Sequence, residues 1–340
     1  MKKIIYIALL AAFAAGCAKE AKTGVNENAI RYFQAWQKVN YPNADSTSLG
    51  AYIIEKEEGT GEAIKNEGYV IAEYTVSDLE GNISSYTNEE TAKQLGAYSE
   101  IFYYGPKVIN INRGKVQVGI ADILSGSKIG GRVKAAIPSW LMTTSQLGGK
   151  EDYMNTATES NNYIYDIKVV GFTEDINKWQ VDSVDSYIKS HKDIFGDMTI
   201  KDTIKGISGI WYKQLKAPVD TTSFPKDTTI YINYTGKLLN GHIFDTTDER
   251  LAKDNGLYSP SKSYGPVKIS WGEEASKITM GSGSTVINGF SLTLWQMRAM
   301  EKGIVIFTST HGYGTSGSGQ VIPPYSPLIF EIEIVAKPEK

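Results

Sequence analysis

The side chains that most often carry covalent catalysis or bind metal ions are scarce and scattered in this sequence. The three histidines, His191, His242 and His311, lie far apart, and Cys17 is the sole cysteine. Zinc sites require clustered His, Cys or carboxylate ligands at short spacings, and this distribution supplies none. We therefore expect no metal and no other cofactor. The cysteine count also excludes disulfides and thiol catalysis in the folded body.

A second group of residues is better placed to form a binding site. The stretch GQVIPPYSPLIF, Gly319–Phe330, holds three prolines and passes directly into alternating apolar residues. Proline donates no ladder hydrogen bond, so these residues predict a stiff, hairpin-like loop at 314–327 followed by a strand. Tyr313 precedes this loop between two glycines, which indicates a turn that presents its phenol at a rim.

Length and composition narrow the class of protein. The chain has 340 residues, which is too long for one ordinary core and about right for two domains. A net charge of -3, without any run of lysine and arginine, gives no electrostatic case for binding nucleic acid, so we expect no such partner. Tyrosine and glycine are frequent, which suits strand-rich domains with many turns.

The first 17 residues resemble a bacterial lipoprotein signal. Lys2 and Lys3 form a basic start, the apolar stretch at 4–13 is too short for a permanent membrane span, and small residues precede Cys17. An ordinary secretory signal with a chance cysteine is the alternative. The resemblance implies lipid on Cys17, a polar tether and helix at 18–45, and a membrane anchor in the cell envelope. We expect the outer membrane and leave its periplasmic or surface face open.

Three blocks of sequence recur at an offset of about 160 residues. The pairs are LGAYIIEKEEGTGE at Leu49 with ISGIWYKQLKAPVD at Ile207, VIAEYTVSDLEGNI at Val70 with IYINYTGKLLNGHI at Ile230, and YYGPKVINI at Tyr103 with SYGPVKISW at Ser263. Chance similarity does not keep one register across separate blocks, so the chain contains a tandem duplication. We place the copies at 46–172 and 205–338, with a linker helix in 173–204.

A helical pattern precedes each copy. The residues expected on one helical face are Tyr32, Trp36 and Val39 in the first pattern and Val181, Val184 and Ile188 in the second. The second pattern follows the acidic start Glu174-Asp175, which favours a helix N-terminus. We interpret both helices as spacers that pack on the adjacent domain, with a dimerisation helix as the alternative.

Short β-branched or aromatic runs, bounded by turn-forming residues, predict strands within the copies. In the second copy they are Ile210–Leu215, Thr228–Tyr234, Ile304–Ser309 and Leu328–Val335. One helix is expected at Phe290–Met300, with Leu292, Trp295 and Met300 available to cover a sheet. Strands with one helix predict an α+β fold in which an antiparallel sheet wraps on a helix.

The second copy carries a family resemblance. The strings YINYTGKLLNGHIFDTTDER, VINGF, HGYG and VIPPYSPLIFEIEI follow one another within 210–336. Together they resemble an FKBP-type peptidyl-prolyl cis/trans isomerase. The resemblance implies two tandem FKBP-like domains, isomerase activity in the second, and proline-containing polypeptides as partners. His311 departs from the pattern, and Leu251–Lys277 makes the segment before the helix longer than usual.

The resemblance also implies roles for particular residues. The expected catalytic residues are Tyr234, Phe244, Asp245, Arg250, Ile287 and Tyr313, and the expected substrate-binding residues are Val286, Phe290, Val321, Ile322 and Phe330. The Ile287 N–H is expected to hold the carbonyl that follows the substrate proline. Phe290 stands where many members carry tryptophan. A carboxylate beside apolar residues must be paired, and either Arg250 or the Tyr234 hydroxyl is a candidate partner for Asp245.

The first copy keeps Tyr74-Thr75 at the position of Tyr234 but has lost the Phe-Asp pair, the aromatic floor and the Tyr-Gly turn. It has Val76 where the second has Gly236, Ser84-Ser85 at the Phe-Asp position, and Thr143-Thr144 in place of the Tyr-Gly turn. We expect a domain that keeps the fold without isomerase activity. Its role is open: it binds unfolded chains, spaces the catalytic domain from the membrane, or pairs subunits.

Three functions compete at this stage. The first is a lipid-anchored prolyl isomerase that assists the folding of exported proteins. The second is a non-catalytic chaperone or scaffold that uses its FKBP-like domains as binding modules, which the degenerate first copy and the long segment favour. The third is an adhesin or glycan-capture lipoprotein, suggested only by the anchor and the aromatic content. The retained pocket residues favour the first.

Overall fold

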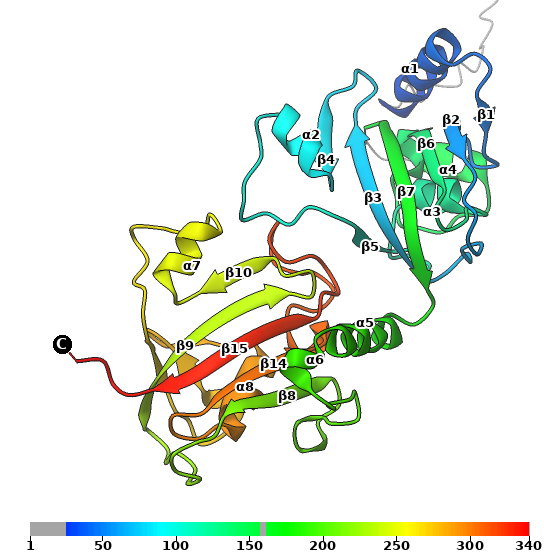
Figure 1. The fold of residues 1–340 in the computed structure, drawn as a ribbon. Coiled ribbons are helices and arrows are strands. Elements are labelled where there is room, and N and C mark those ends of the chain that lie inside the picture. Colours follow the sequence, from blue (N-terminus) through cyan, green and yellow to red (C-terminus); the bar gives the residue numbers. More distant parts are fainter. Residues whose placement is uncertain (1–24, 157–160, 340) are drawn as a thin grey trace, which may run out of the picture.

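The structure is a computed structural model that describes residues 25–156 and 161–339. Within these ranges the chain forms two antiparallel sheets, each covered on one face by a short helix, which confirms the α+β prediction (Figure 1). The expected signal sequence with Cys17 lies outside the described residues. Among the helices that are described, none combines the length and the apolar character needed to cross a membrane.

The first sheet runs in the order β1-β2-β6-β7-β3-β4, with β5 paired to β3. Its strands are β1 Asp45–Ser46, β2 Tyr52–Glu57, β3 Tyr69–Ser77, β4 Ile83–Tyr86, β5 Lys107–Asn110, β6 Arg132–Ile137 and β7 Tyr163–Thr173. The helices of this part are α1 Val25–Asn40, α2 Glu89–Gln94, α3 Val118–Leu124, the 3-10 turn η1 Ser139–Leu141 and α4 Lys150–Thr156. Helix α3 covers the sheet, because Ile120, Ile123 and Leu124 are buried.

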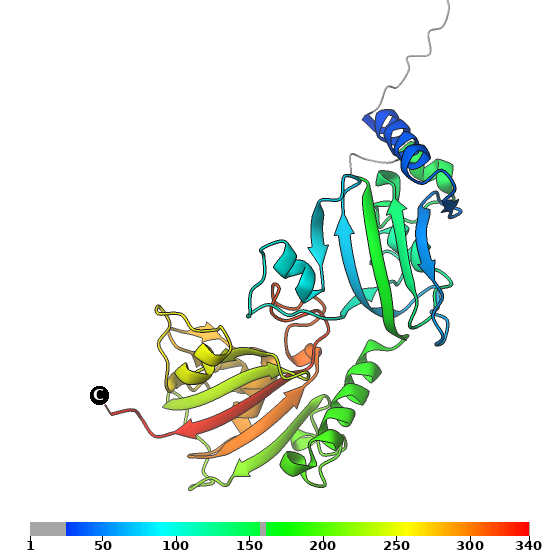
Figure 2. The same ribbon diagram turned by 45° about the horizontal axis from the view of Figure 1, so that its top comes forward.

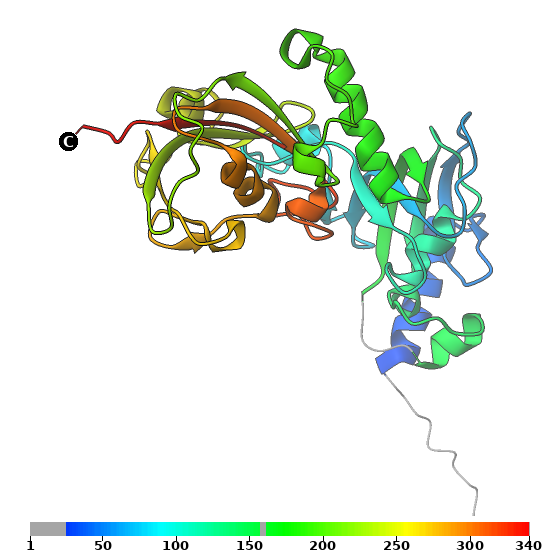
Figure 3. The ribbon, with the colours of Figure 1, turned by 90° about the horizontal axis from the view of Figure 1, so that it is seen from below.

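The second sheet runs in the order β13-β12-β11-β9-β15-β14-β8, with β10 paired to β9. Its strands are β8 Ile210–Lys216, β9 Thr229–Leu238, β10 Ile243–Thr246, β11 Val267–Ser270, β12 Thr279–Met280, β13 Ser284–Thr285, β14 Lys302–Phe307 and β15 Leu328–Val335. The helical elements are α5 Ile176–Ser190, α6 Lys192–Phe195, η2 Ile204–Gly206, α7 Glu249–Asp254, η3 Ala275–Lys277, α8 Asn288–Gln296 and η4 Ser309–His311. Helix α8 lies in the hollow of the curved sheet (Figure 3).

The duplication is visible in matching contacts. The rings of Tyr98 and Tyr104 stack at 5.6 Å in the first copy, and those of Tyr258 and Tyr264 stack at 5.6 Å in the second. The Tyr104 hydroxyl accepts a hydrogen bond from the Ser99 N–H at 3.1 Å, and the Tyr264 hydroxyl accepts one from the Ser259 N–H at 2.9 Å. Most of the segment 251–277 therefore has a counterpart in the first copy.

The extra length of the second copy begins at Trp271, later than the sequence suggested. It forms η3 and the β12–β13 hairpin, which adds two short strands to the edge of the sheet. Trp271 is buried and its ring stacks on that of Trp295, with 5.4 Å between the centroids. The Phe224 ring also packs against Trp271, edge-on and with 5.0 Å between the centroids. The insertion thus extends the core and the sheet.

The predicted helix Phe290–Met300 ends early, because Arg298 terminates it. The Arg298 Nη1 donates to the carbonyls of Trp295, Gln296 and Met297, which satisfies groups that a longer helix would use internally. Met300 then adopts a left-handed φ of 62° and does not cover the sheet. Leu292 and Trp295 pack on the core as half-buried side chains, as expected. The fully buried face consists of Phe290, Leu294 and Met297, so the expected face was only partly right.

The face predicted for the first helix was only partly right, because Trp36 packs on the core as expected but its two companions do not. In α1, Tyr32 and Val39 are exposed, whereas Phe33 is fully buried. The Phe33 ring packs edge-on against Trp140 and at a tilt against Tyr52, each with 5.5 Å between ring centroids. Because of these tertiary contacts Phe33, and not its neighbour Tyr32, faces the core.

Helix α5 follows its prediction. Val184 and Ile188 are buried, and the Asp175 carboxylate caps the helix by accepting the N–H groups of Asn177 and Lys178. Its apolar side packs with Trp211, Ile304, Ile306 and Ile329 on the second sheet. The helix is therefore a spacer that packs on the domain following it, and it runs between the two sheets (Figure 2).

Candidate active site

An aromatic cluster forms where β9, β10, β15 and α8 meet. Phe330 lies at its centre, and the distances from its ring centroid are 5.1 Å to Phe290, 5.5 Å to Phe244, 5.7 Å to Phe307 and 6.2 Å to Tyr234. Strand pairing aligns β15 with β9, so Phe330 and Tyr234 extend from neighbouring strands to the same side. Val286, Ile287, Val321 and Ile322 belong to the same core cluster. The structure thus assembles every apolar residue predicted for the site.

Gly236 makes this assembly sterically possible. A Cβ atom at Gly236 would lie 2.6 Å from the Phe244 ring and 2.8 Å from the Phe330 ring. The cluster therefore requires glycine on the central strand at this point. The first copy has Val76 at the matching position, opposite Tyr165 on the neighbouring strand. An equivalent aromatic cluster therefore cannot form in the first copy. Tyr165 instead lies partly buried beside Val76, and this burial raises the pKa of its phenol to about 12.

Asp245 is held by two donors at the edge of the cluster. The Tyr234 hydroxyl donates to Oδ2 at 2.6 Å, and the Lys262 Nζ donates to Oδ1 at 2.5 Å. Lys262 also donates to the Thr246 carbonyl at 3.0 Å, which fixes the ammonium beside the carboxylate. The predicted pairing with the Tyr234 hydroxyl is confirmed.

Arg250, the other candidate partner, does not pair with Asp245. Its side chain is 93% exposed, and its nearest carboxylate is Asp254, one turn further along α7, at 3.8 Å. Helix α7 points residue 250 to solvent, so the guanidinium does not reach Asp245. Lys262 supplies the positive charge instead, from the segment whose alignment the sequence left open.

Two phenols at this edge stay protonated. Burial, followed by the neighbouring Asp245 carboxylate, raises the pKa of Tyr234 far above its usual value. Burial and the same carboxylate also raise the pKa of Tyr313. The Tyr313 side chain remains 37% exposed, in agreement with the predicted rim position. Both hydroxyls are therefore hydrogen-bond donors at neutral pH.

The start of α8 presents a free backbone donor. Ile287 is the N-cap residue of α8, and no hydrogen bond within the described residues uses its N–H. Gly289 lets the helix approach the sheet, since a Cβ there would lie 2.5 Å from the Phe307 ring. Helix N-termini leave such N–H groups for external acceptors, so this position suits a substrate carbonyl.

The proline-rich loop is a hairpin, as predicted. Ser318 and Ile322 exchange two backbone hydrogen bonds of 2.8 and 3.1 Å, and the Tyr325 N–H closes the loop on the Gly314 carbonyl at 3.0 Å. This geometry places Val321 and Ile322 beside the aromatic cluster. His311, which departs from the family pattern, contacts Asn288 at 3.0 Å and the Ser208 carbonyl at 2.9 Å, so it connects α8 to the turn before β8.

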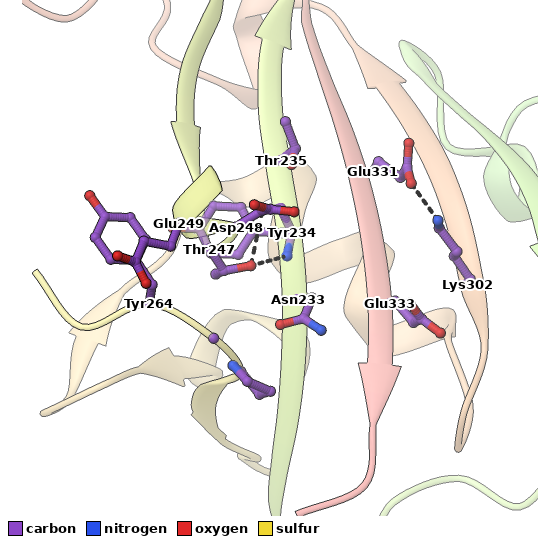
Figure 4. A pocket seen from close by; sticks show the side chains of 12 residues that line it. Asn233, Tyr234, Thr235, Thr247, Asp248, Glu249, Tyr264, Lys302, Glu331 and Glu333 are labelled. Atoms are coloured by element: carbon purple, nitrogen blue, oxygen red, sulfur yellow. Dashed lines mark hydrogen bonds and ion pairs between the residues drawn. The ribbon is translucent and has the colours of Figure 1, made fainter. Parts of the chain in front are cut away.

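A hollow lies on the other face of the same strands. It is a polar groove of about 590 Å³ whose lining includes Asn233, Thr235, Lys302, Glu331 and Glu333 (Figure 4). Lys302 and Glu331 pair across it at 2.6 Å. The groove offers charged side chains where a proline ring needs apolar ones, so we do not place the site there.

Lys262 is the site residue that sequence comparison with the family missed. A signal was present inside the chain itself. In the register of the duplication, Asp245 matches Ser85 and Lys262 matches Phe102. The carboxylate and the ammonium are therefore both present in one copy and both absent from the other, as expected for partners.

Comparisons with known proteins match the part of the chain that contains this cluster. The family model for FKBP-type peptidyl-prolyl cis-trans isomerase matches residues 221–335. FK506-binding protein 1A of Aspergillus fumigatus is 32% identical over 124 residues, which cover 36% of this chain and 90% of that protein. The FK506-binding protein of Neisseria meningitidis serogroup B is 32% identical over 110 residues, covering 32% and 80%. A probable FKBP-type peptidyl-prolyl cis-trans isomerase of Haemophilus influenzae is 30% identical over 135 residues, covering 40% and 45%.

Proposed function

Since this chain belongs to the FKBP-type peptidyl-prolyl cis-trans isomerase family, we propose that its second domain isomerises X-Pro bonds in an apolar pocket formed by the aromatic cluster. The observation that carries this proposal is Phe330 packed among Tyr234, Phe244 and Phe290, with Asp245 and Tyr313 at the edge. FKBP-type isomerases act on proline-containing peptides. The pocket and the role of each residue are our proposal.

The chemistry fits such a site. Rotation about a peptide bond has a barrier of about 18–20 kcal/mol because resonance must be broken, and no nucleophile or metal is needed to lower it. The twisted amide has lost conjugation, so an apolar environment stabilises it better than it stabilises the planar form. In the proposed complex the Ile287 N–H holds the carbonyl after proline, and Asp245 with Tyr313 polarises and orients the amide.

The test is proline-limited isomerisation of a short peptide by the full chain. We expect the wild-type protein to raise the cis/trans exchange rate well above the uncatalysed rate, and Tyr313→Phe to lower kcat/KM by about two- to tenfold through loss of one hydrogen bond. A wild-type chain that leaves the uncatalysed rate unchanged sinks the proposal. Activity in an isolated 46–172 fragment would contradict our view that the first domain is not an isomerase.

We also propose that the protein is a lipoprotein of the bacterial cell envelope, placed in the outer membrane, that assists the folding of exported proteins. The support is sequence alone: two lysines, a short apolar stretch and small residues directly before Cys17. Several acyl chains on one cysteine anchor a protein firmly, since each buried CH₂ is worth about 0.8 kcal/mol.

Cys17→Ser should abolish lipid attachment to the protein. Without the thiol no lipid can be attached at this position, so the uncleaved or soluble chain is expected to lose metabolic labelling with palmitate. The control is Ser48→Ala, which leaves the signal intact. Retained labelling in the Cys17→Ser chain would contradict the proposal, because the lipid would then be attached at another residue.

A further inference from the structure

The proline-rich loop of the second domain ends on a strained tyrosine that the first domain buries. Tyr325 has a φ of 61°, a left-handed conformation that costs free energy in any residue with a Cβ. Its side chain is only 8% exposed. The Tyr69 ring packs edge-on against it at 5.4 Å, and the Asn110 Nδ2 donates to its hydroxyl at 3.2 Å. Contacts with the first domain therefore offset the strain.

A second contact reaches the tip of the same loop. The Tyr103 N–H donates to the Gln320 carbonyl at 2.8 Å, directly before Val321. The Tyr103 ring packs against the second core and lies 6.4 Å from the His242 ring. His242 in turn contacts the Ile101 carbonyl through Nε2 at 3.2 Å. The segment 101–110 of the first domain thus lies along the rim of the proposed pocket (Figure 2).

A third contact holds the start of the rim. The Ser309 N–H donates to the Gln180 Oε1 at 2.7 Å, and Gln180 on α5 is 1% exposed. Ser309 opens η4, which leads into Tyr313. A neutral amide acceptor fully buried in a linker helix indicates a fixed joint between that helix and the site.

All three contacts fall within 309–325, the segment that carries Tyr313, Val321 and Ile322. This segment contains Gly312, Gly314, Gly317 and Gly319, and the last three adopt left-handed φ values. Such a loop loses much conformational entropy when it is ordered. Without outside contacts it would have to be ordered at each binding event, which weakens binding.

The docking residues are specific to the first copy. In the register of the duplication, Tyr69, Tyr103 and Asn110 match Thr229, Ser263 and Ser270 of the second copy. Tyr69 and Asn110 face each other across β3 and β5, as Thr229 and Ser270 do across β9 and β11. The copy that lost the pocket residues therefore carries larger polar and aromatic groups where it touches the other domain.

We propose that the first domain and helix α5 are a positioning element of the isomerase, which holds the pocket rim at 309–325 in its binding conformation. This inference rests on the proposed function of the second domain. Tyr69, Asn110 and Gln180 are positioning residues, because they act through the loop and do not touch substrate.

The test exchanges the docking residues for those of the second copy in the full chain, as Tyr69→Thr with Asn110→Ser. Because the ordering cost falls on substrate and transition state alike, we expect KM to rise roughly three- to tenfold with kcat within about twofold. Amide hydrogen exchange at 314–325 should become faster. Gln180→Met removes the third contact independently and should move KM in the same direction.

The matched control is Tyr32→Thr with Asn82→Ser, a pair of the same residue types on the first domain that makes no contact with the second. It should leave KM and loop exchange at wild-type values. Kinetics and exchange equal to this control in both docking variants would overturn the inference, and so would faster exchange with unchanged KM. The proposed function fails only if the wild-type chain has no isomerase activity. An active wild-type chain with unchanged docking variants would overturn the inference alone.

Discussion

Phe330→Ala is expected to lower the free energy of unfolding of the second domain by about 3–5 kcal/mol. Phe330 is 5% exposed and touches the rings of Tyr234, Phe244, Phe290 and Phe307, which extend from three strands and the helix. These rings cannot close the cavity together, because each is anchored in a different element. Loss of the central ring should also abolish most of the isomerase activity.

Hydrogen exchange of the β9 and β15 amides measures this loss for one domain at a time. The matched control is Tyr165→Ala, which removes the ring that holds the equivalent strand position in the first copy. It should destabilise β3 and β7 and leave β9 and β15 unchanged. A loss below about 1 kcal/mol in Phe330→Ala would mean that the cluster collapses around the gap, contrary to the geometry described.

Asp245→Ala is expected to reduce kcat/KM by about ten- to a hundredfold. Hydrogen bonds to charged groups contribute about 1.5–3 kcal/mol, and removal of the carboxylate leaves the largely buried Tyr234 hydroxyl without its acceptor. It also removes the negative charge that faces Tyr313. The peptide isomerisation assay measures the effect, and the same change at the exposed Asp254 serves as control.

Replacing Lys262 should lower kcat/KM more than replacing Arg250, because only Lys262 pairs with Asp245. Lys262→Met should lower kcat/KM by no more than about fivefold, because the Lys262–Asp245 pair is partly exposed and such pairs contribute about 0–1 kcal/mol. Arg250→Met should change it by less than about twofold. If Arg250→Met proved as damaging as Asp245→Ala, the family pattern would hold in solution and our assignment of Lys262 would fail.

Much of the fold followed from local sequence. Strand β15 begins and ends where alternating apolar residues after the prolines predicted it, and α5 buries Val184 and Ile188 as expected. These elements are set by periodicity and by residues that cannot continue a strand or helix. The duplication added a second source of information, since the copies could be compared position by position without any other protein.

Three features required the tertiary structure. Helix α1 buries Phe33 because this ring packs against Trp140 in η1 and Tyr52 in β2. Helix α8 ends at Gln296 because the Arg298 side chain binds the carbonyls at its C-terminus. Neither partner set is visible in a periodic pattern. The docking of the first domain on Tyr325 likewise joins residues more than 200 positions apart in the chain.

The features of the site also fall into two groups, those visible in the sequence and those that depend on the fold. The aromatic side chains, the glycine between them, the carboxylate and the proline-rich rim could be predicted from the sequence, because an apolar pocket needs particular residue types at fixed strand and turn positions. That Lys262, and not Arg250, neutralises Asp245 emerged only from the three-dimensional fold, because an ion pair depends on the distance between two charges in space. The same reason applies to the contacts of Tyr69, Tyr103 and Gln180 with the rim: a backbone turn is fixed within a few residues, whereas a contact between domains is fixed by how whole surfaces meet.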